Sequence, residues 1–263
     1  MGNANLTDDI WGQILSFLTA LKGIYIGSDE DCRKFVEAVL WVLRSGAQWR
    51  LLPVERGNWN SVYKRFIRGG DKGVWAAMHA HFANDPDMEC IMIDGTIVRA
   101  HACSAGAPQG HLAEPKDQAL GRSKGGFTTK IHVMVDALGN PLDFILTGGQ
   151  AADVTQAYVL IHGVKATYAL MDKAYDANKL IEQLQQQGII PVIPPKSNRK
   201  ELREYDKDIY KERSLIECLI GKLKQFRRVF SRFEKWAKNY MYFRHIEVKY
   251  FNPKSNRHHR LPY

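Results

Sequence analysis

The chain has 263 residues, 45% of them apolar, which is enough to bury the core of one large domain or of two smaller ones. No apolar run approaches the roughly 18 residues of a membrane span, and the N-terminal MGNANLTDD lacks the basic and apolar parts of a signal peptide. We therefore expect a soluble cytosolic protein with no membrane partner. The four cysteines, at Cys32, Cys90, Cys103 and Cys218, form no C-x-x-C pair, so we expect reduced structural thiols and no zinc site.

The net charge of +9 is unevenly distributed along the chain. Residues 196–263 carry 19 Lys and Arg against 8 Asp and Glu, a net charge of +11, which leaves −2 for residues 1–195. Such an asymmetry indicates a polyanionic partner, most simply nucleic acid, although a basic terminus can also serve only as a solubilising tail.

Residues 1–84 are predicted to be helical. Asp8 is placed to cap a first amphipathic helix, and Ser28 with Asp31 has the spacing of a capping box for a second. After Pro and Gly breakers, WNSVYKRFIR predicts a third helix with a basic end. This pattern is compatible with helix-turn-helix-like DNA binding and equally with a dimerisation unit, because cations favour helix C-termini in any case.

From Cys90 the pattern changes to short apolar runs. CIMIDGTIV predicts a buried strand interrupted by Asp94, and FTTKIHVMVD and PLDFILTGG predict two more strands joined as a hairpin. Helices over 153–162, capped by Asp153, and over 178–187 then alternate with the strands YALMD and IIPVIPP. Three antiparallel strands followed by alternating helices and strands predict an α/β fold with a mixed sheet, preceded by a small all-helical N-terminal domain.

The segment YKERSLIECLIGKLK, residues 210–224, is predicted to be an amphipathic helix. Its polar residues Tyr210, Arg213, Glu217 and Lys224 lie within roughly 60° of one another around the helix. The opposite side is apolar and comprises Leu215, Ile216, Leu219, Leu223 and Phe226. Taken alone, the polar stripe is more simply a solvated face with an i,i+4 ion pair, and the rest of the chain must decide its meaning.

Asp94 and Asp172 each follow an apolar strand, and carboxylates at neighbouring strand ends can meet at one edge of a sheet. Glu217 would complete such a cluster from the helix. Three crowded carboxylates repel one another unless cations neutralise them, and two Mg²⁺ ions suit displacement at phosphorus. Each aspartate taken singly is more simply a turn or cap residue. Asp176 is the rival to Asp172, but it is better placed to cap the next helix.

Several ordered motifs together resemble the bacterial insertion-sequence transposases of insertion sequence family five. They are IDGTIVRAH, GRSKGGFTTKIHVMVDALGNPL, MDKAYDANKL, IPPKSNRK, and the polar stripe followed by KQFRRVFSRFEK. The resemblance runs from about Leu6 to Tyr240. It implies a helical N-terminal domain over 1–84 and an RNase H-like catalytic domain over 88–240.

The resemblance also implies the chemistry. A DDE triad of Asp94, Asp172 and Glu217 would bind two Mg²⁺ or Mn²⁺ ions. Tyr210, Arg213 and Lys224 match the family signature around the glutamate and are expected to contact DNA, with Arg213 and Lys224 neutralising phosphate near the metals and Tyr210 packing on or hydrogen-bonding to the DNA end. Such enzymes cleave DNA at the inverted-repeat ends of the element and transfer the freed 3′-hydroxyl into target DNA. The family resemblance therefore implies DNA as the partner, a dimer or larger assembly on paired ends, and a place at the bacterial nucleoid.

Basic residues beyond the stripe alternate with Phe226, Phe230, Phe233 and Trp236, which predicts a strip that contacts the DNA backbone or a basic helix with an aromatic core face. These basic residues are Lys222, Arg227, Arg228, Arg232 and Lys235. Arg122 and Lys124, in the loop GRSKGG, are further candidates for DNA contacts.

The chain departs from the family pattern after Tyr240, where residues 241–263 form an atypical polar, basic tail. Two alternatives to the transposase therefore stay open. The first is a catalytically impaired relict that still binds DNA, and the second is a metal-dependent DNA nuclease that performs no strand transfer.

Overall fold

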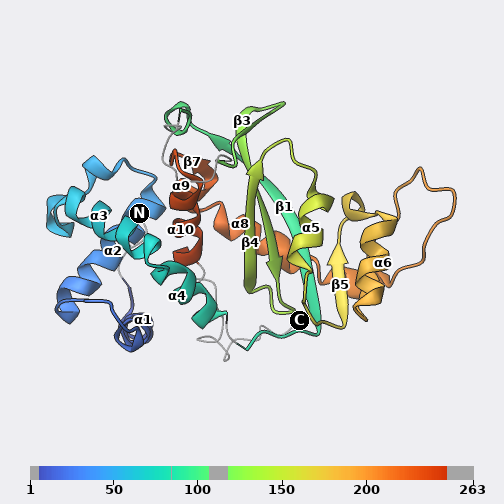
Figure 1. The fold of residues 1–263 in the computed structure, drawn as a ribbon, viewed down its shortest axis with the longest axis horizontal. Helices are drawn as coiled ribbons and strands as arrows, with labels where there is room; N and C mark the ends of the chain where they lie inside the picture. The colour runs from blue at the N-terminus through green and yellow to red at the C-terminus, as the bar shows by residue number, and fades with distance from the viewer. Residues whose placement is uncertain (1–5, 84, 107–117, 248–263) are drawn as a thin grey trace.

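The computed structural model describes residues 6–83, 85–106 and 118–247. It begins with a group of helices on one side of a central sheet (Figure 1). These are α1 (Asp8–Ala20), α2 (Asp29–Ser45), the short η1 (Trp49–Leu51) and η2 (Val54–Arg56), α3 (Trp59–Asp71) and α4 (Val74–Phe82). None of the described helices is long and apolar enough to cross a membrane.

Local signals in the sequence set the ends of these helices. The hydroxyl of Ser28 accepts a hydrogen bond from the amide of Asp31, as a capping box requires, and α2 stops at Gly46, whose φ of 68° favours glycine. The cap of α1 was predicted one residue too late. Thr7 is the N-cap, and Asp8 is the first helical residue. The Thr7 hydroxyl accepts a hydrogen bond from the amide of Ile10, and the carboxylate of Asp8 in the first turn interacts favourably with the helix dipole.

The described strands form one mixed sheet. They are β1 (Cys90–Ala100), β2 (Gly121–Ser123), β3 (Gly126–Val135), β4 (Pro141–Gly148), β5 (Tyr168–Met171), β6 (Ile190–Val192) and β7 (Ser231–Arg232). β3 pairs antiparallel with β1 and with β4. β5 pairs parallel with β1 and with β6. The remaining described elements are η3 (Ala102–Ser104), α5 (Asp153–Leu160), η4 (Lys173–Tyr175), α6 (Asn178–Gln186), α7 (Lys207–Lys211), α8 (Ser214–Leu223), α9 (Arg227–Phe230) and α10 (Ala237–Glu247). The predicted mixed α/β sheet behind a helical N-terminal region is confirmed.

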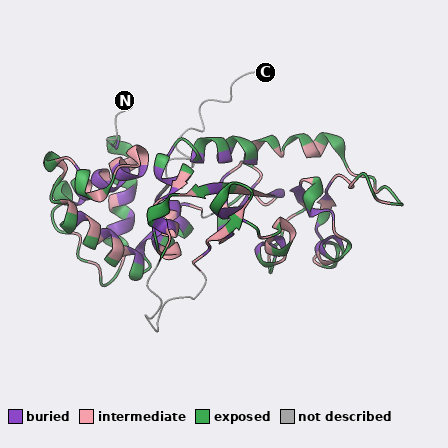
Figure 2. Cartoon of the chain, turned by 90° about the horizontal axis from the view of Figure 1, so that it is seen from above, coloured by how far each residue is buried: buried purple, intermediate pink, exposed green. Residues whose placement is uncertain are grey.

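Side-chain alternation along the strands divides the core in two. On β1, Ile91 and Ile93 pack with α5 and α6, whereas Met92 packs with α8, α10 and the N-terminal helices. Buried residues accordingly lie on the inner sides of the helices and in the strands (Figure 2). Because the N-terminal helices share a hydrophobic core with the sheet, the domain boundary expected near residues 84–88 stays a prediction.

The helix α10 corrects the predicted C-terminal tail. Tyr240, Phe243 and Ile246 are buried, and the Phe243 ring stacks on Phe66 of α3 with 4.6 Å between centroids. At Gly70 of α3 a Cβ would lie 2.1 Å from the Tyr242 ring, so glycine is needed for this close approach. The polar tail therefore does not begin at Met241, since residues 241–247 continue a packed helix, and residues 248–263 lie outside the described part.

Two arginines predicted to contact DNA are instead buried. Arg228 pairs with Glu234 (Nε to Oε1, 2.6 Å) below the ring of Phe243, and Arg232 is fully buried. The guanidinium of Arg232 donates to the carbonyls of Gln118, Ala119, Glu234 and Lys235 and to the Thr129 hydroxyl. The prediction was wrong for these two residues, because the alternation of basic and aromatic residues does not show which guanidinium has carbonyl partners inside the fold.

Replacing Arg232 by Met should lower the free energy of unfolding by roughly 3 kcal/mol or more, because several buried carbonyls lose their donor. Arg227→Met is the matched control on an exposed position and should stay within about 0.5 kcal/mol of the parent. Urea unfolding measures both. A stable Arg232→Met protein that has lost only DNA affinity would restore the original assignment.

A pair of histidines lies between α4, α10 and β4. The rings of His79 and His245 are 5.4 Å apart between centroids, and His79 Nε2 lies 2.9 Å from the carbonyl of Leu142. Burial lowers the pKa of His245 to about 4, and the neighbouring His79 and Arg244 act in the same direction. Burial also lowers the pKa of His79. Both rings are therefore neutral in the folded protein near pH 7.

The free energy of unfolding should fall as the pH drops from about 6.5 to 4. In this window the unfolded chain binds a proton at His245 that the folded protein does not, which gives a slope of up to about 1.4 kcal/mol per pH unit. Urea unfolding of the parent and of His245→Phe at several pH values tests this. The variant should show the flatter dependence, and identical slopes would contradict the buried neutral histidine.

Candidate active site

Asp94 and Asp172 are adjacent through strand register. β1 and β5 pair in parallel up to Ile93 and Met171, which are partners in the register. The next residue on each strand is an aspartate, so Asp94 and Asp172 leave this pair at the same level of the sheet. In contrast to the prediction, Asp94 does not end its strand, since β5 stops here while β1 continues to Ala100.

Glu217 reaches this level from α8. Met92 of β1 packs in the same cluster as Ile216 and Leu219, so α8 covers the face toward which Met92 points. Because side chains alternate along a strand, Asp94 points toward the same face. The apolar side of α8 is buried as predicted, and the Glu217 side chain remains 60% exposed beside the sheet.

Arg213 lies at a break in the helix that was predicted to be continuous. α7 ends at Lys211 and α8 begins at Ser214, so Arg213 is the residue before α8. Its Nη2 donates to Oδ2 of Asp94 at 2.7 Å, and its Nη1 donates to Oε1 of Glu217. One guanidinium therefore joins the carboxylate of the sheet to that of the helix.

The surroundings of Asp94 favour its protonated form, even though Arg213 lies beside it. Burial raises the pKa of Asp94, and Arg213 opposes this rise. The negative charges of Asp172 and Asp153 raise the pKa of Asp94 further. Burial likewise raises the pKa of the Tyr175 hydroxyl, and the same group of aspartates raises it further. The charges of Asp94, Asp153 and Asp172 therefore all act on the Tyr175 hydroxyl.

Asp176 has a structural role. It is buried, forms an ion pair with Arg199, and lies 3.2 Å from the guanidinium of Arg203. It does not cap α6, whose N-cap is Ala177, so the expected capping role was wrong. Asp172 is half-buried, and its carboxylate accepts one backbone hydrogen bond, which leaves it the more available of the two.

A fourth carboxylate lies on the opposite face of β1, and sequence reasoning missed it. Asp153 is the first residue of α5 rather than its cap, and its carboxylate contacts Lys130 at 3.0 Å and His132 at 3.4 Å. Burial by itself would raise the pKa of Asp153, but the neighbouring His132 and Lys130, the latter hydrogen-bonded to it, outweigh burial and lower the pKa. A Cβ at Gly95 would lie 2.2 Å from Asp153, so glycine allows this contact. The spacing of Lys130 and His132, on one side of β3, was the available signal.

The donor set fits a hard divalent cation. Asp94, Asp172 and Glu217 offer carboxylate oxygens, which Mg²⁺ prefers, and the negative charges of Asp172 and Asp153 also act on Asp94. In the part of the chain that is described, no three acidic, histidine or cysteine side chains lie close enough to hold a metal as they stand. Arg213 lies between two of the three carboxylates instead.

The remaining predicted DNA contacts are accessible. The basic residues among them are exposed: Lys222 of α8, Lys224 just after it, Arg227 of α9, Arg122 of β2 and Lys124 in the turn that follows β2. Tyr210 is half-buried, with its ring edge-on to Tyr205 at 5.6 Å. Among the aromatics predicted to be core, Phe226 is buried, whereas Phe230 is 56% exposed.

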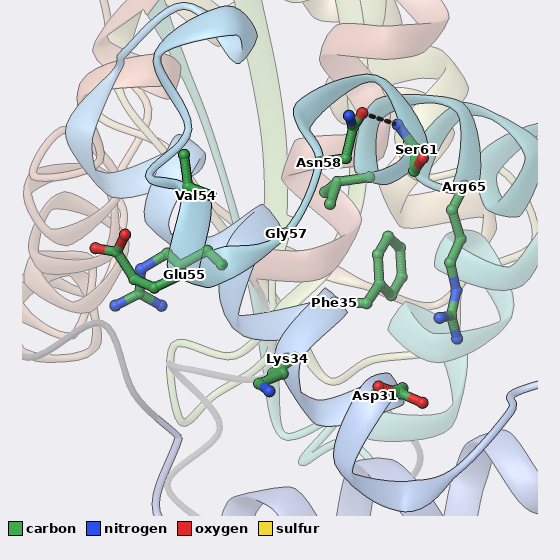
Figure 3. A pocket seen from close by; sticks show the side chains of 11 residues that line it. Asp31, Lys34, Phe35, Val54, Glu55, Gly57, Asn58, Ser61 and Arg65 are labelled. Atoms are coloured by element: carbon green, nitrogen blue, oxygen red, sulfur yellow. Dashed lines mark hydrogen bonds between the residues drawn. The ribbon is translucent and has the colours of Figure 1, made fainter.

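A pocket of about 440 Å³ lies elsewhere, between α2, η2 and α3. Phe35, Asn58 and Arg65 line it, with Asn58 hydrogen-bonded to the amide of Ser61 (Figure 3). Its lining includes none of the three candidate carboxylates, so this pocket does not coincide with the carboxylate site of Asp94, Asp172 and Glu217.

The chain is similar in sequence to several known proteins. A putative transposase for insertion sequence element IS6501 from Brucella ovis is 39% identical over 124 residues, which cover 45% of this chain and 93% of that protein. An uncharacterized protein y4sN from Sinorhizobium fredii is 41% identical over 102 residues, 39% of this chain and 82% of that protein. A putative transposase for IS402 from Burkholderia cepacia is 33% identical over 123 residues and is covered to 55% of its length.

Among solved structures, the fold is similar to the piggyBac transposase in its synaptic complex with hairpin DNA. The TM-score is 0.53 at 10% identity, and the match covers 96% of this chain and 73% of that one. This likeness concerns the fold alone and agrees with the RNase H-like core.

Two family matches divide the chain between them. Residues 6–79 match the family described as putative transposase of IS4/5 family. Residues 85–246 match the family described as transposase DDE domain. This second match spans more than half of the length of the chain, and the chain therefore belongs to the DDE-domain transposase family.

Proposed function

We propose that this transposase cleaves the ends of its element and transfers the 3′-hydroxyl strand into target DNA through Asp94, Asp172 and Glu217. The observation that carries the proposal is the parallel register of β1 and β5, which brings Asp94 beside Asp172. Arg213 connects Glu217 to the same place. A cluster of this composition has no evident role in the packing of the core.

The three carboxylates are proposed to hold two Mg²⁺ or Mn²⁺ ions, which when bound would supply Lewis acidity and stabilise charge at phosphorus. Asp94 and Asp172 would hold them from the sheet, and Glu217 from α8. The apolar face of α8 fixes the helix to the sheet, so the backbone of Glu217 keeps a constant position beside the strands. Lys130 and His132 keep Asp153 paired on the other face of β1.

DNA is proposed to pass over the exposed cations near this site. Lys222, Lys224 and Arg227 lie beyond Glu217, and Arg122 and Lys124 lie at β2 and the turn that follows it. Tyr210 is the proposed contact for the DNA end beside the carboxylates. Since strand transfer needs two ends held together, we propose an assembly of at least two chains on paired ends, acting at the nucleoid. The division into domains over 1–84 and 88–240 is part of the same proposal.

Asp94→Ala, Asp172→Ala and Glu217→Gln should each reduce DNA cleavage by at least roughly 100-fold, because charge positioned at the reacting centre is removed. The substrate is a duplex carrying the terminal inverted repeat of the element, with Mg²⁺ present. Asp208→Asn, on an exposed acid of α7, is the control and should cleave like the parent.

The other outcomes of this experiment separate the alternatives. Unchanged cleavage in the three variants would contradict the triad. End binding by the parent without cleavage would identify a catalytically impaired relict. Cleavage without joining to target DNA would identify a nuclease.

Replacing Lys222 and Lys224 together by Gln should weaken DNA binding and reduce the slope of log affinity against log salt by about 2, since two phosphate contacts are lost. Fluorescence anisotropy over a salt series measures this slope. Lys165→Gln with Lys179→Gln, two exposed positions after α5 and on α6, is the matched double control for this site. An unchanged slope in the Lys222 and Lys224 variant would exclude these residues from the DNA surface.

A further inference from the structure

The positively charged Arg213 lies between two of the proposed metal ligands, where a metal ion would be expected. Its side chain is 13% exposed, and its two terminal nitrogens each serve a different carboxylate, that of Asp94 and that of Glu217. Asp94 is itself only 17% exposed, so without a partner its charge would be costly in the half-buried position on β1. The guanidinium therefore satisfies the carboxylates without any metal.

We propose that Arg213 is a built-in counter-cation that occupies the acidic site until metal and DNA arrive, and that it must leave this bridge for metal to bind. This inference rests on the proposed function, since it takes Asp94 and Glu217 to be metal ligands. It adds that metal binding competes with a residue of the protein itself.

The two contacts of Arg213, with Asp94 and with Glu217, form the two arms of the bridge and differ in exposure, which would allow a metal ion to replace the guanidinium. The Glu217 side chain is 60% exposed and projects from the first turns of α8, so it can rotate without disturbing the core. The Asp94 arm is more enclosed. Nε of Arg213 is buried and has no hydrogen-bond partner among the described residues, so the guanidinium has a donor to spare. The Glu217 arm is therefore expected to open first.

Opening the bridge has a consequence for DNA binding. Once Arg213 leaves the carboxylates, its planar fork of donors suits a phosphate oxygen pair, and a metal takes over the neutralisation of the acids. Metal binding and phosphate binding then favour the same state of Arg213. By thermodynamic linkage each must strengthen the other by the same factor.

Mn²⁺ binding to the DNA-free protein tests the competition. Electron paramagnetic resonance titrations would compare the parent with Arg213→Gln, Arg213→Lys and Asp94→Asn. Arg213→Gln should bind Mn²⁺ roughly tenfold more tightly than the parent, a typical size for coupling between two ligands. Arg213→Lys keeps the charge but loses the planar fork, so its affinity should fall between the two. The control Arg50→Gln changes an exposed arginine of η1, outside the bridge and the proposed DNA surface, and should match the parent.

Thermal unfolding in EDTA provides a readout that is independent of metal affinity. Without metal, Arg213→Gln should melt on the order of 5 °C below the parent, because Asp94 loses its counter-charge. Added Mn²⁺ should restore more of this loss than it adds to the parent. If Arg213→Gln does not fold, the comparison of Arg213→Lys with the parent decides.

The outcomes separate this inference from the proposed function. Mn²⁺ binding that depends on Asp94 but is equal in the parent, Arg213→Gln and Arg213→Lys overturns the counter-cation and leaves the metal site standing. Mn²⁺ binding that does not depend on Asp94 in any of these proteins contradicts the metal site itself, and the inference with it.

Discussion

The charge of Asp94 on the central strand is the constraint on which this site depends. A carboxylate that is 17% exposed between paired strands needs a positive partner, and Arg213 supplies one at 2.7 Å. Arg213 can do so because α7 and α8 are separate helices with this residue at the junction between them. The buried side of α8 holds that junction against the sheet. The packing of the amphipathic helix α8 thus determines which positive charge lies beside Asp94 on β1.

The basic C-terminal part of the chain serves two purposes that its charge alone does not separate. Arg228 bonds Glu234 and the carbonyl of Ala47. Arg232 bonds the carbonyls of Ala119 and Glu234 and the hydroxyl of Thr129 in β3. Lys222, Lys224 and Arg227 remain exposed nearby. Part of the positive charge is therefore structural, and the part left on the surface is the part that can meet a polyanion.

Short-range patterns predicted most of the fold. Ser28 and Gly46 fixed the ends of α2, and apolar runs separated by turn residues identified β3, β4 and β5, because these signals act over a few residues. Long-range contacts produced the errors. The polar residues after Met241 appeared to end the fold, yet Arg244 lies over the ring of Phe144, 4.7 Å from its centroid, and Phe243 stacks on Phe66 in the N-terminal helices.

For the site, the sequence by itself determined which carboxylates follow apolar strands and which face of the 210–224 segment is polar, since both depend on local periodicity. Only the tertiary structure decided that Asp94 and Asp172 meet through the register of β1 and β5, and that Asp176 is held by Arg199. It also placed Asp153 behind Gly95 and made Arg213 a bridge rather than one half of a surface pair. The physical reason is that a charge is balanced by whatever lies within a few ångströms, and for Asp94 that partner lies more than a hundred residues away along the chain.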